Sequence, residues 1–183
     1  GKGGSDRAGA LRKGDRLRVI VDYDDGSVRF LKNGEAHGPG WGAGSLRGVA
    51  VVPAVQMRYE GQSVRLVGVE DEEEEAAKAE EAEAEAGAVW DSCDEAEVEL
   101  SEQGKLATKT KGGDGYTLVT CESAKVEKGR HSFEYEIVGE NVNALCMGVV
   151  SAGLEERSGK DYAVRKEDRA WLMNAGGGNL WGN

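Results

Sequence analysis

The chain has 183 residues, of which 28 are glycine and 2 are proline, and its formal net charge is −11. This length suits one domain with a substantial core, and the abundant glycine favours many short strands joined by tight turns. The charge is concentrated in residues 70–85, which hold ten acidic side chains and one lysine. Because no clustered basic stripe occurs elsewhere, nucleic-acid binding is not expected.

Three cysteines, Cys93, Cys121 and Cys146, form an odd set without Cys-x-x-Cys spacing. This usage is typical of a reduced protein, so we expect a cytoplasmic location. The sequence also has no signal-peptide pattern and no apolar run of about 18 residues, which predicts a soluble chain without membrane contact.

Residues 1–14 are rich in glycine and basic side chains without any periodicity and are expected to form a loop. In the next stretch, Leu17, Val19 and Val21 alternate with polar side chains, which predicts a half-buried strand. Asp25-Gly26 and Asn33-Gly34 suit tight turns, the second of type I′. Residues 14–34 are therefore predicted to form a β-hairpin followed by a second chain reversal.

Residues 35–48 are expected to be another loop, in which Trp41 either covers the edge of the core or contacts a partner. The apolar residues 49–55 predict a strand buried on both faces, and residues 62–69 predict a further strand. The Glu/Ala-rich run that follows has high helix propensity but no apolar face. We interpret it as a solvated spacer, with an acidic docking tail for a basic partner as the alternative.

Strand patterns return after this spacer. Val98 and Leu100 alternate with glutamates, and residues from 106 onward are expected to form the partner strand. In residues 129–138, Phe133, Tyr135 and Ile137 define a clear apolar face. Residues 143–151 are apolar throughout, which predicts a strand in the middle of a sheet.

Several of these motifs resemble the SPRY family. The central signature of that family is resembled by Gly14-Asp15, Asp22, Gly26, Phe30 and Lys32-Asn33-Gly34. Its closing strands are resembled by Val52-Pro53-Ala54-Val55 and Ser63-Val64-Arg65-Leu66, and its opening strands by Gly129, His131, Phe133-Glu134 and Gly148-Val149. Residues 162–182, with Tyr162, Trp171 and Gly182, resemble the stretch that follows the opening strands. The resemblance implies an all-β fold, a two-sheet antiparallel β-sandwich.

The two halves stand in reversed order. The opening half of the SPRY-like domain occupies residues 88–183, the acidic linker residues 71–87, and the closing half residues 1–70. Three explanations follow: a circular permutant whose termini meet in one loop, a slice through tandem repeats, or self-association in which one copy's half completes a neighbour. We favour a single compact permuted domain.

The sequence predicts neither an enzyme nor a cofactor. Glu134 and Glu136 lie two residues apart on one strand and could form a pair of catalytic carboxylates like that of glycosidases. Acidic residues at this spacing more often belong to a solvent-exposed sheet surface. His37 and His131 lack a recognisable catalytic context, and two distant histidines with three scattered cysteines match no metal-ligand spacing. The expected catalytic and metal-binding sets are therefore empty.

The resemblance instead implies a protein or short-peptide binding module. In SPRY adaptors, a shallow pocket is formed by loop residues that match Arg58, Tyr59, Ser151 and Tyr162 here. At the first two positions the adaptors carry a small aliphatic residue and a tryptophan, so the same peptide motif is not implied. Two alternatives stay open: a structural scaffold unit of a large assembly, and a sugar-binding lectin that stacks rings on Trp41 or Trp181.

Overall fold

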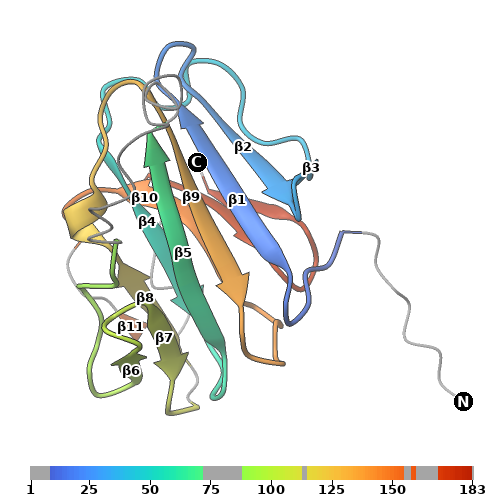
Figure 1. The fold of residues 1–183 in the computed structure, drawn as a ribbon, viewed down its shortest axis with the longest axis vertical. Coiled ribbons are helices and arrows are strands. Elements are labelled where there is room, and N and C mark those ends of the chain that lie inside the picture. The colour runs from blue at the N-terminus through green and yellow to red at the C-terminus, as the bar shows by residue number, and fades with distance from the viewer. Residues whose placement is uncertain (1–8, 72–87, 113–114, 155–157, 160–168, 183) are drawn as a thin grey trace, which may run out of the picture.

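The computed structural model describes residues 9–71, 88–112, 115–154, 158–159 and 169–182. These residues fold into two antiparallel sheets packed face to face, with the strands of one layer crossing in front of the other (Figure 1). The predicted all-β, two-sheet antiparallel sandwich is confirmed.

The larger sheet has seven strands. Their spatial order is β3 (Glu35–Ala36), β2 (Ser27–Lys32), β1 (Arg16–Asp22), β9 (Arg130–Ile137), β5 (Ser63–Asp71), β7 (Leu106–Lys109) and β6 (Val98–Ser101). The smaller sheet has six strands, in the order β11 (Ser158–Gly159), β8 (Tyr116–Thr120), β4 (Val51–Met57), β10 (Cys146–Ser151), β12 (Ala170–Asn174) and β13 (Leu180–Gly182). A short 3₁₀ turn, η1 (Glu122–Ala124), follows β8.

The hairpin predicted in residues 14–34 is present as β1 and β2. Leu17, Val19 and Val21 are fully buried, so the alternation of the sequence marks the core face. Asn33 and Gly34 both have positive φ, 50° and 86°, as a type I′ turn requires, and they lead into the short strand β3. The second reversal is therefore confirmed as well.

The early and late parts of the chain interleave in both sheets. Strand β9 pairs with β1 on one side and with β5 on the other. In the smaller sheet, β4 pairs with β8 and β10, which both come from the late part. Neither part could complete a sheet without the other.

The two ends of the described chain also lie together. The Leu11 amide donates a hydrogen bond of 2.7 Å to the Ala175 carbonyl. Gly9 and Gly178 are so close that a Cβ added to Gly178 would lie 2.9 Å from the Gly9 carbonyl oxygen.

The main core fills the space between the sheets. Phe133, Tyr135 and Ile137 of β9 contribute to it, as their spacing predicts, and the Tyr135 hydroxyl donates to the Gly148 carbonyl of the facing sheet at 2.6 Å. A second apolar cluster lies on the outer face of the smaller sheet and includes Val52, Ala54 and Val150. Strands β4 and β10 are thus buried on both faces and central, as residues 49–55 and 143–151 predict.

Some details differ from the sequence-based expectation. Strand β5 continues through Asp71, the first residue assigned to the acidic linker, because β9 extends opposite it and pairs His131 with Asp71. The strand expected from residue 106 onward is present as β7, and its buried positions are Ala107 and Lys109. Residues 72–87 lie outside the described part of the chain.

Trp41 is half buried at the edge of the core. Its ring lies 5.8 Å from that of Phe30, and its backbone pairs with Val28. This contact agrees with the interpretation of Trp41 as a cover over the core edge. In the described residues, no helix has the length and apolar character needed to cross a membrane.

Gly148 provides a test of the β10–β12 contact. A Cβ at this position would lie 2.0 Å from the Trp171 carbonyl oxygen, whereas a Cβ at Gly68 would meet no atom within 4 Å. We expect Gly148→Ala to lower the free energy of unfolding by about 2–3 kcal/mol, because packed backbone must move apart. Gly68→Ala, the matched control, should leave it unchanged or slightly raised, and urea denaturation measures both; equal effects would contradict this close packing.

Candidate functional site

The turn between β4 and β5, residues 58–62, is held by one buried side chain. The Gln62 carbonyl oxygen accepts hydrogen bonds from the backbone amides of Arg58, at 2.7 Å, and Tyr59, at 3.0 Å. Its amide nitrogen donates to the Asn143 carbonyl at 2.8 Å. Gln62 is fully buried, so these bonds fix the turn without competition from water. We call residues 58–62 the Tyr59 turn.

The Tyr59 turn presents a stack of three side chains. The Arg58 guanidinium carbon lies 5.4 Å from the centre of the Tyr59 ring and 5.2 Å from that of the Tyr116 ring, both within range of a cation–π contact. Tyr116 belongs to the apolar cluster on the outer face of the smaller sheet. Tyr59 is 38% exposed and is the one large hydrophobic side chain classed as exposed among the described residues.

The four residues implied by the family resemblance do not form one group. Arg58 and Tyr59 lie together directly after the end of β4. Ser151 pairs with Val51, the first residue of β4, and therefore lies near the opposite end of the sandwich. Tyr162 is outside the described residues, so its place relative to the other three stays a prediction.

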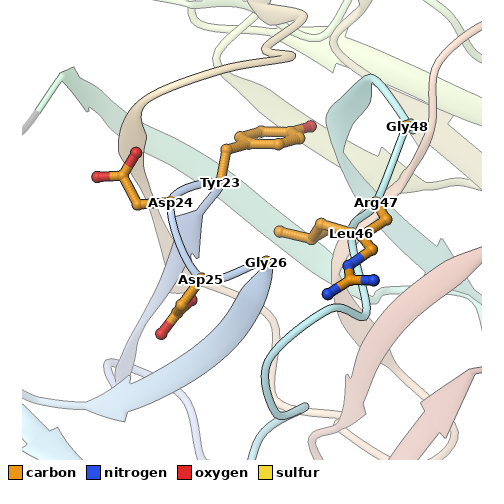
Figure 2. A pocket seen from close by; sticks show the side chains of 7 residues that line it. All are labelled: Tyr23, Asp24, Asp25, Gly26, Leu46, Arg47 and Gly48. Atoms are coloured by element: carbon orange, nitrogen blue, oxygen red, sulfur yellow. The ribbon is translucent and has the colours of Figure 1, made fainter.

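Two adjoining surface hollows lie at the end of the sandwich where Ser151 is found. The smaller, of about 280 Å³, is formed by residues 23–26 of the β1–β2 turn and residues 46–48 (Figure 2). The larger, of about 540 Å³, is formed by Asp24 and by residues 125–129 and 131. Asp24 lines both hollows. We call this region, residues 22–26, 44–49, 125–131 and 151–153, the Asp24 end.

Tyr23 forms a fixed wall in the Asp24 end. Its hydroxyl lies 2.7 Å from the Val49 carbonyl oxygen and 2.9 Å from that of Val126, and can donate to either. Burial raises the pKa of Tyr23 to about 12, so the hydroxyl keeps its proton at neutral pH. The ring is therefore held in place by groups on two separate loops.

The glutamates considered as a catalytic pair are bound to arginines. Glu134 accepts hydrogen bonds from Arg16, at 3.0 Å, and from Arg18, at 3.0 Å. Glu136 accepts one from Arg65 at 2.6 Å. These ion pairs run across β1, β9 and β5, which favours the interpretation of both glutamates as parts of a charged sheet surface.

The cysteines are buried free thiols. Burial raises the pKa of Cys121, and it raises the pKa of Cys146 to about 12. A nucleophile or metal ligand needs the thiolate form, which burial disfavours here. In the described part of the chain, no group of three or more His, Cys, Asp or Glu side chains is placed to hold a metal ion.

Sequence reasoning missed a buried ammonium group between the two sheets. Lys109 is 1% exposed, and its Nζ lies 2.6 Å from Glu97 Oε2 and 2.6 Å from Thr117 Oγ1. The Thr117 hydroxyl also hydrogen bonds to the Glu97 carboxylate. We call these three residues the Lys109 network. The hydrogen bond from Lys109, followed by that from Thr117, lowers the pKa of Glu97.

Comparisons with known proteins identify no relative: no family model, no curated protein and no solved structure matches the chain.

The Lys109 network should make the free energy of unfolding depend on pH. We expect Glu97→Gln to cost of the order of 3 kcal/mol at pH 7, because it leaves a buried ammonium without a counter-charge. The folded-state pKa of Glu97 is depressed, so its contribution is present above the ordinary glutamate pKa and is lost as the pH falls through the folded-state value. The difference between wild type and variant should therefore shrink as the pH falls below 4.5, the ordinary value for glutamate.

Urea denaturation between pH 3 and pH 7 measures this difference. Glu140→Gln is the matched control, because Glu140 also pairs with a lysine, Lys13 at 3.1 Å, but its side chain is 85% exposed. The control should change the free energy of unfolding by less than about 1 kcal/mol. Equal effects of both substitutions at pH 7 would show that burial of Lys109 does not matter.

Proposed function

We propose that this chain is a non-catalytic recognition module that binds a protein or short peptide through loops of the sandwich, with the Tyr59 turn as the main contact. The observation that carries this proposal is the exposed Tyr59 ring stacked on Arg58, on a turn whose shape Gln62 fixes. Tyrosine and arginine dominate the binding energy of many protein interfaces. A turn that is already ordered loses little entropy on binding.

We also propose that the sandwich is of the SPRY type with its halves in permuted order. The hairpin with its Asn33-Gly34 turn and the central placement of β4 and β10 support this assignment. The close approach of Gly9 and Gly178 supports the permutation, because it brings the two ends of the described chain together. The buried free thiols are consistent with a cytoplasmic location, which we include in the proposal.

A reordered chain tests the permutation. In this variant Asn183 is joined to Gly1, and the chain is opened within residues 72–87, so that it begins near residue 88 and ends near residue 71. We expect a monomer with the same near-ultraviolet circular dichroism and one cooperative unfolding transition, because every strand pairing is kept. An aggregated or non-cooperative product would contradict the permuted assignment.

Tyr59→Ala tests the recognition function. Phage-displayed dodecapeptides are selected for binding to the wild-type protein. The affinity of each selected peptide is then measured for the wild type and for the variant. We expect the selected peptides to lose at least about tenfold in affinity for Tyr59→Ala, the loss typical of a hot-spot aromatic. The thermal midpoint should change little, since the ring is exposed.

Glu60→Ala is the matched control on the same turn, since Glu60 is also exposed and contributes no ring. It should keep the affinity of the wild type. Selected peptides that bind Tyr59→Ala as well as the wild type would refute the Tyr59 turn as the main contact. A large fall in the thermal midpoint would instead show that Tyr59 is a packing residue.

A further inference from the structure

The turn between β2 and β3 carries a dipeptide with a reactivity of its own. Asn33 is the one asparagine in the sequence that is followed by glycine, and both residues are exposed. Asparagine is thermally labile because the backbone nitrogen of the next residue can attack its side-chain carbonyl carbon. A glycine at that next position has no side chain to block the attack. A Cβ at Gly34 would meet no atom within 4 Å, so the fold leaves this nitrogen open to approach as well.

Two hydrogen bonds hold the side-chain amide of Asn33 against the start of β1. Its oxygen accepts from the Arg16 backbone amide at 2.8 Å, and its nitrogen donates to Asp15 Oδ1 at 2.9 Å. The Asn33 backbone amide also donates to the Arg16 carbonyl at 2.9 Å, so this residue extends the β1–β2 ladder by one pair. Because both polar atoms of the amide have partners on the other strand, these bonds must break before the amide can reach the Gly34 nitrogen.

The Asp15 carboxylate joins this turn to the segment before β1. Its Oδ2 lies 3.0 Å from Lys32 Nζ and accepts from the Arg12 backbone amide at 2.8 Å. Lys32 also donates to the Ala10 carbonyl at 2.9 Å. Burial raises the pKa of Asp15, but the hydrogen bonds from Asn33 and its other partners outweigh burial and hold the pKa below its ordinary value. The acceptor of the Asn33 amide nitrogen is therefore a charged carboxylate at neutral pH.

We propose that Asn33 is a site of spontaneous deamidation, which is protected in the closed turn and reacts when the turn opens. In the reaction, the Gly34 backbone nitrogen loses its proton to hydroxide and forms a bond to Asn33 Cγ. The bond from Cγ to Nδ2 breaks, and Nδ2 takes a proton from water and leaves as ammonia. Water then opens the cyclic imide at either of its carbonyl groups, which gives aspartate or isoaspartate at position 33. Water is the only reactant besides the chain itself.

Neither product restores the closed turn. The Asn33 nitrogen that donates to Asp15 at 2.9 Å becomes a carboxylate oxygen in the aspartate product, so two carboxylates face each other. Two charges of the same sign at this distance repel. The isoaspartate product lengthens the main chain by one carbon, which a two-residue turn of fixed register does not accommodate. The modified turn therefore stays open and weakens the links of Asp15 to residues 10–12, and this change accumulates as the protein ages.

Peptide mapping by mass spectrometry tests the site in the whole chain. The protein is incubated at pH 8 and 37 °C, and the conversion of each asparagine to aspartate or isoaspartate is followed over time. Asn33 should convert faster than Asn143, an exposed asparagine followed by alanine. A synthetic peptide of residues 29–38 lacks the contacts with residues 15 and 16. It should convert at least about tenfold faster than Asn33 in the folded protein, where the turn must open first.

Two variants of Asp15 show whether its hydrogen bond protects Asn33. Asp15→Ala removes the acceptor of the Asn33 amide nitrogen, so it should speed conversion in the folded protein at least about threefold. Asp15→Asn keeps a side-chain oxygen that can accept this bond and should convert more slowly than Asp15→Ala. Glu35→Gln is the matched control, because Glu35 is an exposed acid beside the same turn but is not the acceptor. It should convert at the rate of the wild type.

Asn33→Asp reproduces one product directly. Repulsion from Asp15 raises the folded-state pKa of the carboxylate pair, so its cost is present at pH 7 and is lost as the pH falls through that value. The variant should therefore have a lower urea midpoint than the wild type at pH 7, and the difference should shrink in acid. Three results would each overturn the proposal: conversion of Asn33 no faster than that of Asn143, equal rates in the peptide and the folded protein, or an unchanged midpoint of Asn33→Asp at pH 7.

Discussion

The antiparallel pairing of β9 with β1 and β5 is the interaction on which the rest of the structure depends. It inserts a late strand between two early ones, and it brings Phe133, Tyr135 and Ile137 into the core between the sheets. The same register fixes the loops at both ends. At one end the backbone amide of Tyr23 donates a hydrogen bond of 2.9 Å to the Gly129 carbonyl. At the other end the backbone amide of Gly139 donates one of 3.1 Å to the Ser63 carbonyl. The pairing of β9 with β1 and β5 thus fixes the positions of the loops in both candidate binding regions.

Buried polar groups fix how one sheet lies over the other. The Tyr135 hydroxyl joins β9 to the β10 carbonyl of Gly148, and the Lys109 network joins β7 to β8. Apolar side chains alone allow two sheets to slide, because dispersion and the hydrophobic effect have little directionality. A hydrogen bond in a dry interior is directional and costly to break. These two cross-links therefore specify the alignment of the layers, on which the loop positions depend.

The sequence predicted the turns and strand faces that depend on neighbouring residues, and it missed the contacts that depend on the register between strands. Asn33-Gly34 and the alternation around Tyr135 need only neighbouring residues, and both interpretations are confirmed. The burial of Lys109 depends on Glu97 and Thr117, which no periodicity links to it. The split between Arg58 and Ser151 follows from the β4–β10 register. The hollows at Asp24 arise where three distant loops meet, and the sequence predicted only one of these loops, the turn at Asp25-Gly26.

The buried amide of Gln62 has a consequence for how this surface can change. It holds the turn through backbone atoms of residues 58 and 59 and through a carbonyl across the sandwich, and it makes no use of their side chains. The shape of the turn is therefore independent of the identity of the side chains that it displays. Substitutions at positions 59 and 60, whose side chains are exposed, can therefore change the surface that the turn displays with little effect on the fold.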